Sequence, residues 1–194
     1  MSSTLRSKTP RHQNDYYVTP IDDVVLFLKE LESVEGNIFE GKKILDPSAG
    51  GDAINVMSYP TALVEHMGVN PKDITTIDIR QDSRAEIRGD YLKLDMSDKF
   101  DVVITNPPFN LSLDMIKKAL SELKEGGYAI FLVRLNYFGS KARKEFWDTI
   151  LPKYTFVHSK RISFTPDGKK DSIEYMHIVF KKGEHPNYTE LRII

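Results

Sequence analysis

Short apolar runs alternate with amphipathic stretches along the chain. Runs of apolar and β-branched residues predict buried strands at residues 43–46, 74–79, 102–104 and 128–133. Apolar spacing, with capping and stop residues, predicts helices at residues 19–31, 54–59, 113–123 and 143–150. Two later runs flank Pro166-Asp167-Gly168 and predict a terminal hairpin at residues 156–164 and 173–180.

The alternation of strands and helices predicts one α/β domain with a parallel sheet and helices on both faces. In such a sheet the carboxyl ends of the strands meet at one edge, where ligands bind. Polar residues follow the predicted strands at Asp46, Asp78, Asp90 and Asn106. We therefore expect these side chains to line one rim.

The most informative motif is Asn106-Pro107-Pro108-Phe109, directly after the apolar run Val102-Val103-Ile104. The two prolines fix the backbone and hold the preceding residue extended. The strand end becomes a rigid rim that presents an amide, a carbonyl and an aromatic face. The two oxygens can accept both N–H protons of an exocyclic amino group, and the ring can stack on a planar base. The alternative is an ordinary strand followed by a proline-rich turn.

A turn of small residues follows the first strand, in Asp46-Pro47-Ser48-Ala49-Gly50-Gly51-Asp52. Its glycines would let a ligand approach the backbone closely. The turn lacks the G-x-G-x-x-G spacing of dinucleotide-binding folds, which argues against an NAD enzyme. Asp78 suits the hydroxyls of a ribose, and Asp90-Tyr91 suits the amino group and ring face of adenine. The alternative for both acids is an ordinary solvated side chain.

These motifs, in this order, resemble those of the class I S-adenosylmethionine-dependent methyltransferases, and among them the enzymes that act on the N6 amino group of adenine. Asn106-Pro107-Pro108-Phe109 resembles their catalytic motif (D/N/S)PP(Y/F/W), and residues 46–52 resemble their cofactor loop. The specific similarity covers residues 16–110. The resemblance implies a single Rossmann-like domain whose seven-stranded, mostly parallel sheet ends in an antiparallel hairpin.

The resemblance also assigns site residues. The catalytic residues would be Asn106, Pro107, Pro108 and Phe109. The residues that bind S-adenosylmethionine would be Tyr17, Thr19, Pro20, Asp46, Pro47, Ser48, Ala49, Gly50, Asp78, Ile79, Asp90, Tyr91 and Asn106. For Thr19-Pro20 the alternative is a plain helix cap.

Substrate contacts are expected from residues that follow the later strands. Arg134, Asn136 and Tyr137 come after the strand at residues 128–133 and could bind a substrate phosphate or base. Phe164, before the hairpin turn, could form the far wall of a base pocket. Core packing is the alternative for Tyr137 and Phe164.

Composition suits a compact enzyme and narrows its chemistry. The chain has 194 residues, 40% of them hydrophobic, which is enough for one domain core. The sequence has no cysteine, and its five histidines show no ligand spacing, so we expect no disulfide and no metal site. There is no membrane-length apolar stretch and no evident secretory leader, so we expect a cytoplasmic protein without a membrane partner.

The charge is unevenly spread, although the net charge is only −1. Residues 1–15 are expected to form a flexible basic arm, because Arg6, Lys8 and Arg11 stand there without an acid before residue 13. The alternative is a plain flexible terminus. Residues 16–194 would then form the methyltransferase domain. Lysines and arginines after residue 140 could neutralise phosphates, or could be ordinary solvated surface.

The expected activity is methyl transfer from S-adenosylmethionine to the N6 amino group of adenine in nucleic acid, with DNA favoured and RNA possible. The strand and helix pattern uses nearly all residues after Phe109, which leaves little room for a target-recognition domain. Selectivity should therefore be weak or come from a protein partner. The alternatives are an RNA base amino-methyltransferase, a protein-glutamine methyltransferase and a non-catalytic cofactor-binding subunit.

Overall fold

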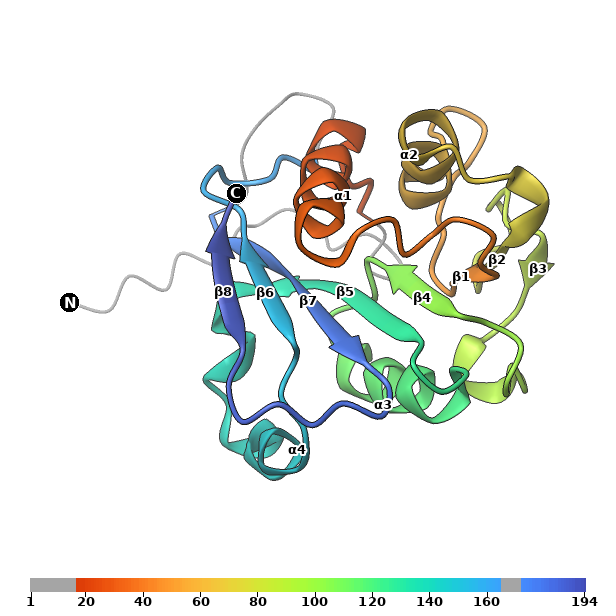
Figure 1. Ribbon diagram of the computed structural model, residues 1–194. Coiled ribbons are helices and arrows are strands. Elements are labelled where there is room, and N and C mark those ends of the chain that lie inside the picture. The colour runs from red at the N-terminus through yellow and green to blue at the C-terminus, as the bar shows by residue number, and fades with distance from the viewer. Residues whose placement is uncertain (1–16, 165–171) are drawn as a thin grey trace.

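The computed structural model describes residues 17–164 and 172–194, which form one eight-stranded sheet with helices on both faces (Figure 1). The strand order is β3-β2-β1-β4-β5-β7-β6-β8. The expected fold class, a mostly parallel α/β sheet with an antiparallel C-terminal pair, is confirmed. The predicted basic arm at residues 1–15 and the hairpin turn at residues 166–168 lie outside the described residues.

The elements are short, and most lie where the apolar pattern predicted them, but the strand expected at residues 156–164 ends at Val157. The strands are β1 (Ile44–Asp46), β2 (Ile74–Asp78), β3 (Ile87–Arg88), β4 (Val102–Thr105), β5 (Tyr128–Arg134), β6 (Tyr154–Val157), β7 (Tyr175–Lys181) and β8 (Glu190–Ile193). The α-helices are α1 (Ile21–Glu35), α2 (Ser58–Met67), α3 (Ser112–Glu122) and α4 (Lys144–Thr149). Among the described residues, no helix combines the length and apolar character needed to cross a membrane.

Strand direction brings the ends of the central strands together at one edge. β3, β2, β1, β4 and β5 run parallel to one another, whereas β7 is antiparallel to both β5 and β6. The eighth strand, β8, pairs parallel with β6, with Tyr154 opposite Glu190. The expected number of seven strands was therefore too low by this edge strand. Its four residues are too few for the alternation of Glu190-Leu191-Arg192-Ile193 to stand out in the sequence.

The two faces of the sheet carry separate cores, because successive strand side chains point to opposite sides. Helices α1 and α2 lie over one face, and α3 and α4 lie over the other (Figure 1). Ile104 of β4 belongs to the core that contains Phe27 of α1. Its neighbour Val103 belongs to the core that contains Ile116 of α3. The rigid layers hold the loops at the carboxyl ends of the strands in place.

The helix after the small-residue turn starts later than the sequence predicted. It begins at Ser58 rather than at Ile54, and Ile54 is 90% exposed. The Asp52 side chain accepts hydrogen bonds from the backbone N–H groups of Ile54 and Asn55, each at 2.8 Å. A local side-chain turn of this kind competes with helix formation. The segment before α2 is therefore loop, and part of it faces the cleft described next.

Candidate active site

A cleft opens at the carboxyl ends of β1, β2 and β4. Its empty volume is about 800 Å³, counting its open mouth. Most of the predicted cofactor residues line it, namely Tyr17, Thr19, Pro47, Ser48, Ala49, Gly50, Asp78, Ile79, Asp90, Tyr91 and Asn106. The wall also contains residues that the sequence did not suggest as cofactor contacts, namely Val18, Gly51, Val56, Ser58, Tyr59, Arg80, Gly89, Leu92, Pro108, Leu111 and Met115.

Two adjacent glycines let the turn after β1 bring its backbone to the cleft wall. Gly50 and Gly51 have φ values of 68° and 69°, a conformation that favours glycine over other residues. A Cβ atom on Gly51 would lie 2.7 Å from Cγ of Met57. Both glycines line the cleft. The turn therefore exposes backbone atoms, rather than side chains, to a ligand.

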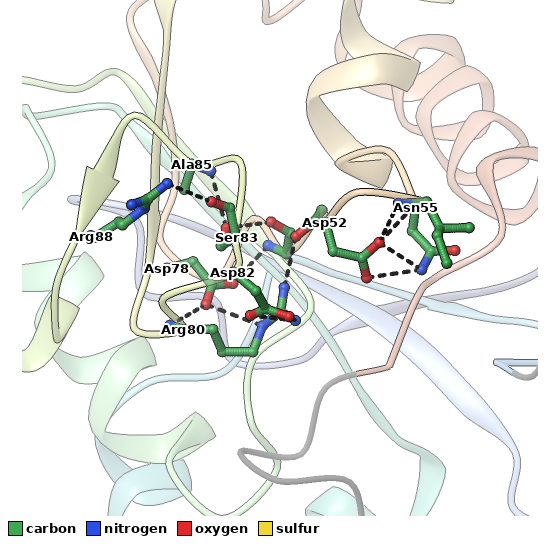
Figure 2. A network of polar contacts seen from close by, with 11 residues as sticks. Asp52, Asn55, Asp78, Arg80, Asp82, Ser83, Ala85 and Arg88 are labelled. Carbon is green, nitrogen blue, oxygen red and sulfur yellow. Dashed lines mark hydrogen bonds and ion pairs between the residues drawn. The ribbon is translucent and has the colours of Figure 1, made fainter.

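A buried polar network holds this turn against the loop after β2 (Figure 2). The Gly50 N–H donates to Asp78 Oδ2 at 2.8 Å, and Ser83 Oγ donates to the Gly50 carbonyl at 2.5 Å. Arg80 Nη2 donates to the Gly51 carbonyl at 2.8 Å. Arg80 and Ser83 stand about thirty residues from the turn they hold, so no local sequence signal pointed to them.

Asp78, the predicted ribose acid, is part of that network and also faces the cleft. Its Oδ1 accepts the Arg80 backbone N–H at 2.8 Å and lies 3.4 Å from Arg80 Nε. Each carboxylate oxygen has more than one lone pair, so both can still accept a hydroxyl group from the cleft. Arg80 thus gives this buried acidic side chain a partner of opposite charge.

Asp46 is buried and is not among the residues that line the cleft, so its expected contact with a cofactor stays a prediction. Its Oδ1 accepts from Thr105 Oγ1 at 2.7 Å and from the Ser48 N–H at 3.2 Å. Its Oδ2 is buried without a hydrogen-bond partner in the described part of the chain. Burial raises the pKa of this carboxyl to about 7, against the hydrogen bonds from Thr105 and Ser48. Its role in the structure is to shape the turn.

Asp90 and Tyr91 stand where the chain leaves β3, at the far end of the cleft. Asp90 caps the 3₁₀ turn Tyr91–Lys93, accepting the Leu92 N–H at 3.1 Å, and its side chain is partly exposed. The Tyr91 ring is buried and lines the cleft. A carboxylate beside a buried ring can accept from an amino group and pack on a heterocycle.

Asn106 is fixed at the opposite end of the cleft by a contact across the chain. Its Nδ2 donates to Thr19 Oγ1 at 3.0 Å. Its Oδ1 is buried and has no hydrogen-bond partner among the described residues. Because Thr19 contacts Asn106, it does not cap α1: the cap position is Pro20, without a side-chain hydrogen bond. Pro20 itself lies outside the cleft wall.

Phe109 belongs to a ring of four aromatic side chains beside Asn106. Its ring stacks on Tyr17 with centroids 6.1 Å apart and lies 5.7 Å from Tyr175. Phe164 completes the ring, at 5.8 Å from Tyr17 and 4.9 Å from Tyr175. Phe164 thus stands near Phe109 as expected, while Tyr175 of β7 was not predicted. The rings fill the space between Phe109 and Phe164, so a base would have to displace one of them.

The expected substrate contacts after β5 divide into two groups. The guanidinium carbon of Arg134 lies 4.5 Å from the Phe109 ring centroid, next to the aromatic ring set. Asn136 is exposed and does not line the cleft. Tyr137 lies in the α3–α4 core, where its hydroxyl is 3.0 Å from Ser112 Oγ. Tyr137 therefore follows the core-packing alternative.

Tyr59 connects the cleft wall to a buried pair of histidines. Its hydroxyl is 2.9 Å from Nε2 of His177, whose Nδ1 is 2.9 Å from Nε2 of His158. Burial lowers the pKa of His158 to about 4 and holds the pKa of His177 well below its ordinary value. Both are therefore neutral at pH 7 and serve as hydrogen-bonding groups that fix the tyrosine. Within residues 17–164 and 172–194, no cluster of three or more histidine or acidic side chains could hold a metal ion.

No protein-family model and no curated protein matches the sequence. Solved structures match the fold. A candidate class I S-adenosylmethionine-dependent methyltransferase from Listeria monocytogenes aligns with 91% of this chain at a TM-score of 0.65 and 18% identity. A candidate RNA methyltransferase from Pyrococcus horikoshii aligns over 90% of both chains, with a TM-score of 0.63 and 17% identity.

The type IIG restriction endonuclease BpuSI aligns with 93% of this chain at a TM-score of 0.62 and 16% identity. The present chain spans 65% of the Listeria protein and 27% of BpuSI. At these identities the likeness establishes the fold. The chain has the α/β fold of class I S-adenosylmethionine-dependent methyltransferases.

Proposed function

We propose that the protein transfers a methyl group from S-adenosylmethionine to the exocyclic N6 amino group of adenine in nucleic acid, with DNA favoured. The observation that carries the proposal is the Asn106 carboxamide. Its nitrogen is held by Thr19. Its buried oxygen has no hydrogen-bond partner within the described chain, and Phe109 follows it in the same motif. An acceptor held in this way, next to a flat ring, suits an amino group on a planar base.

The cleft residues fit the cofactor. Asp78 would accept the ribose hydroxyls, Asp90 and Tyr91 would hold the adenine, and the backbone of Gly50 and Gly51 would approach the ligand closely. Asn106 follows β4, which lies two strands away from β2 and Asp78 in the sheet order. It would therefore lie at the end of the cleft where the methyl group is transferred. When bound, S-adenosylmethionine supplies a methyl group already activated by its sulfonium.

The protein then has mainly to aim the amino group. The Asn106 oxygen and the Pro107 carbonyl would accept its two N–H protons, which draws the nitrogen lone pair out of conjugation with the ring. Phe109 would stack on the base after one of its aromatic neighbours gives way. In a duplex the adenine would first have to leave the stack. No strong base is required, because the proton can leave after the nitrogen has been methylated.

The solved structures that share the fold include proteins that act on DNA and on RNA. BpuSI is a restriction endonuclease, and its alignment with 93% of this chain supports DNA. The Pyrococcus horikoshii protein is a candidate RNA methyltransferase that matches over 90% of both chains, which supports RNA as the second candidate. Both share the fold but neither is close in sequence.

The test is incubation of the full chain with S-adenosylmethionine labelled on its methyl group and with separate pools of DNA, RNA and protein. Digestion to nucleosides and chromatography then identify the product. We expect label in N6-methyldeoxyadenosine. Label in an RNA nucleoside would move the proposal to the second candidate, and label only in protein, or in no pool, would contradict it.

A further inference from the structure

We propose that Arg134, stacked on Phe109, forms a binding subsite for a backbone phosphate next to the target base. The inference rests on the proposed function and deepens it, because it assigns a contact for the polymer and not for the methylated base. Arg134 is the last residue of β5, which lies next to β4 in the sheet, and Asn106 directly follows β4.

The charge of Arg134 is not neutralised in the described chain. Its Nε is buried without a hydrogen-bond partner among the described residues, and no described carboxylate forms an ion pair with it. Glu174 lies near Arg134, because the Glu174 carbonyl accepts the N–H of Leu135, the residue after Arg134, at 2.9 Å. The Glu174 carboxylate is already bound by Arg161 at 2.7 and 2.9 Å. Among Arg134, Arg161 and Glu174, the single carboxylate is therefore bound by Arg161 and not by Arg134.

The stacking fixes the orientation of the guanidinium. The guanidinium carbon lies over the Phe109 ring at 4.5 Å from its centroid, which is within cation–π distance, and a guanidinium carries its N–H donors in one plane. Because the ring belongs to the Asn106-Pro107-Pro108-Phe109 motif, the cation is held at the place where the base is expected to bind. A planar fork of donors matches phosphate oxygens, and a phosphodiester lies on either side of every base in a polymer.

The geometry favours a phosphate over the carboxylate of the cofactor. Arg134 is not part of the cleft wall, whereas the predicted cofactor residues Asp78, Asp90 and Asn106 all are. Arg134 is partly exposed and lies against Phe109. A ligand that touches it must therefore extend beyond the cofactor cleft, as a polymer backbone does.

The experiment compares Arg134→Met and Arg134→Lys with the wild-type chain. The probe is a fluorescent oligodeoxythymidylate with one central deoxyadenosine, and its RNA counterpart is a second arm. Binding is measured by anisotropy over a range of salt concentrations. Methionine keeps an apolar side chain on Phe109 but removes the charge. Lysine keeps the charge but lacks the planar set of N–H donors of the guanidinium. Arg192→Met is the matched control, because Arg192 lies on the edge strand β8 and pairs with Glu190 at 2.8 Å.

We expect Arg134→Met to bind the oligonucleotide about tenfold more weakly at low salt, and to lower the slope of log affinity against log salt by about 0.7. Arg134→Lys should keep the slope and lose part of the affinity. Replacing the phosphate beside the deoxyadenosine by a neutral methylphosphonate should weaken the wild type and leave Arg134→Met unchanged. Arg192→Met should behave as the wild type. If only one of the two polymers gives this pattern, that polymer is the source of the phosphate.

An unchanged salt slope in Arg134→Met, equal methylphosphonate losses in Arg134→Met and wild type, or no binding by the wild type would each overturn the subsite. Weaker binding of S-adenosylhomocysteine by Arg134→Met would assign the arginine to the cofactor and would also overturn it. The proposed function is tested separately. Phosphate-dependent binding without methyl transfer would contradict the proposed function but support the phosphate subsite. Methyl transfer together with an unchanged salt slope in Arg134→Met would support the proposed function but contradict the subsite.

Discussion

Asn106 Oδ1 and Asp46 Oδ2 are both buried without a hydrogen-bond partner among the described residues, and they have different consequences. Asn106 Oδ1 belongs to a neutral amide, and its residue lines the cleft. Asp46 Oδ2 belongs to a carboxyl group behind the turn, where burial raises the pKa to about 7. An unsatisfied acceptor in a core costs stability, whereas one in a binding site is available for substrate.

At the scale of single residues, we expect Asp46→Asn to change the pH dependence of stability. The carboxyl pKa is about 7 in the folded protein and 3.8 in the reference state, so the folded state binds the proton more tightly. Wild-type stability therefore falls as pH rises from about 4 to about 7. Between pH 5 and pH 8 the loss is on the order of 2–3 kcal/mol, and the neutral asparagine should not show it.

Urea unfolding of both proteins at pH 5 and pH 8 measures this effect. Any fixed cost of the substitution, such as an unpaired amide N–H, should be similar at both pH values and so cancels in the comparison. The free energy of unfolding of Asp46→Asn relative to wild type should be higher at pH 8 than at pH 5. Equal differences at the two pH values would show that Asp46 ionises normally.

At the scale of elements, the loops after β1 and β2 act as one unit. Asp78 both holds the Gly50 N–H and faces the cleft, whereas Ser83 only holds the Gly50 carbonyl. We therefore expect Asp78→Ala to weaken binding of S-adenosylhomocysteine about tenfold or more, and Ser83→Ala by about threefold or less. Isothermal titration calorimetry measures both. Equal losses would mean that Asp78 acts through the loop alone and makes no ligand contact.

These elements also show which features of the fold the sequence predicts and which it does not. Apolar runs located the central strands, and the polar residues that follow them lie at one edge as predicted. The Gly50 contact of Ser83 and the aromatic contact of Tyr175 were not predicted, because they join residues far apart in sequence. The start of α2 was wrong because a side-chain turn at Asp52 competes with helix formation.

The site residues also differ in how well the sequence predicted their positions. Residues within the motifs mostly lie in the cleft wall, because a strand end fixes the residues directly after it. Tyr137 lies in the core instead, since the 3₁₀ turn Leu135–Phe138 carries its ring to the α3–α4 side. Whether a side chain beyond a motif points to the cleft or to the core depends on a turn that residue types do not define. The catalytic and binding roles themselves stay predictions.

At the scale of the whole molecule, residues 17–164 and 172–194 form one sheet with its helices, and none of them forms a separate recognition unit. With a net charge of −1, contacts to nucleic acid should come from local cationic groups and should be mostly to phosphates. We expect methylation by this chain alone to follow a short context of one to a few bases. Deleting residues 1–12, which carry three cations and no acid, should weaken binding without changing the methylated adenines.

Sequencing of methylated adenines on a plasmid treated with each protein tests both expectations. The full chain and the shortened chain should give the same pattern, with slower methylation by the shortened one. A single long recognition sequence modified without a partner would mean that a loop of this chain reads base edges. A changed pattern after deletion would give residues 1–12 a role in base recognition.

The central claim is that the Asn106 oxygen accepts the target amino group, and Asn106→Ala tests it most directly. The variant and wild type are compared in methyl transfer to DNA and in calorimetric binding of S-adenosylhomocysteine, with Asn70→Ala, an exposed residue at the opposite end of the sheet, as the control. The account predicts a loss of transfer of about a hundredfold or more with cofactor affinity within about threefold of wild type. Near-normal transfer by Asn106→Ala would contradict it.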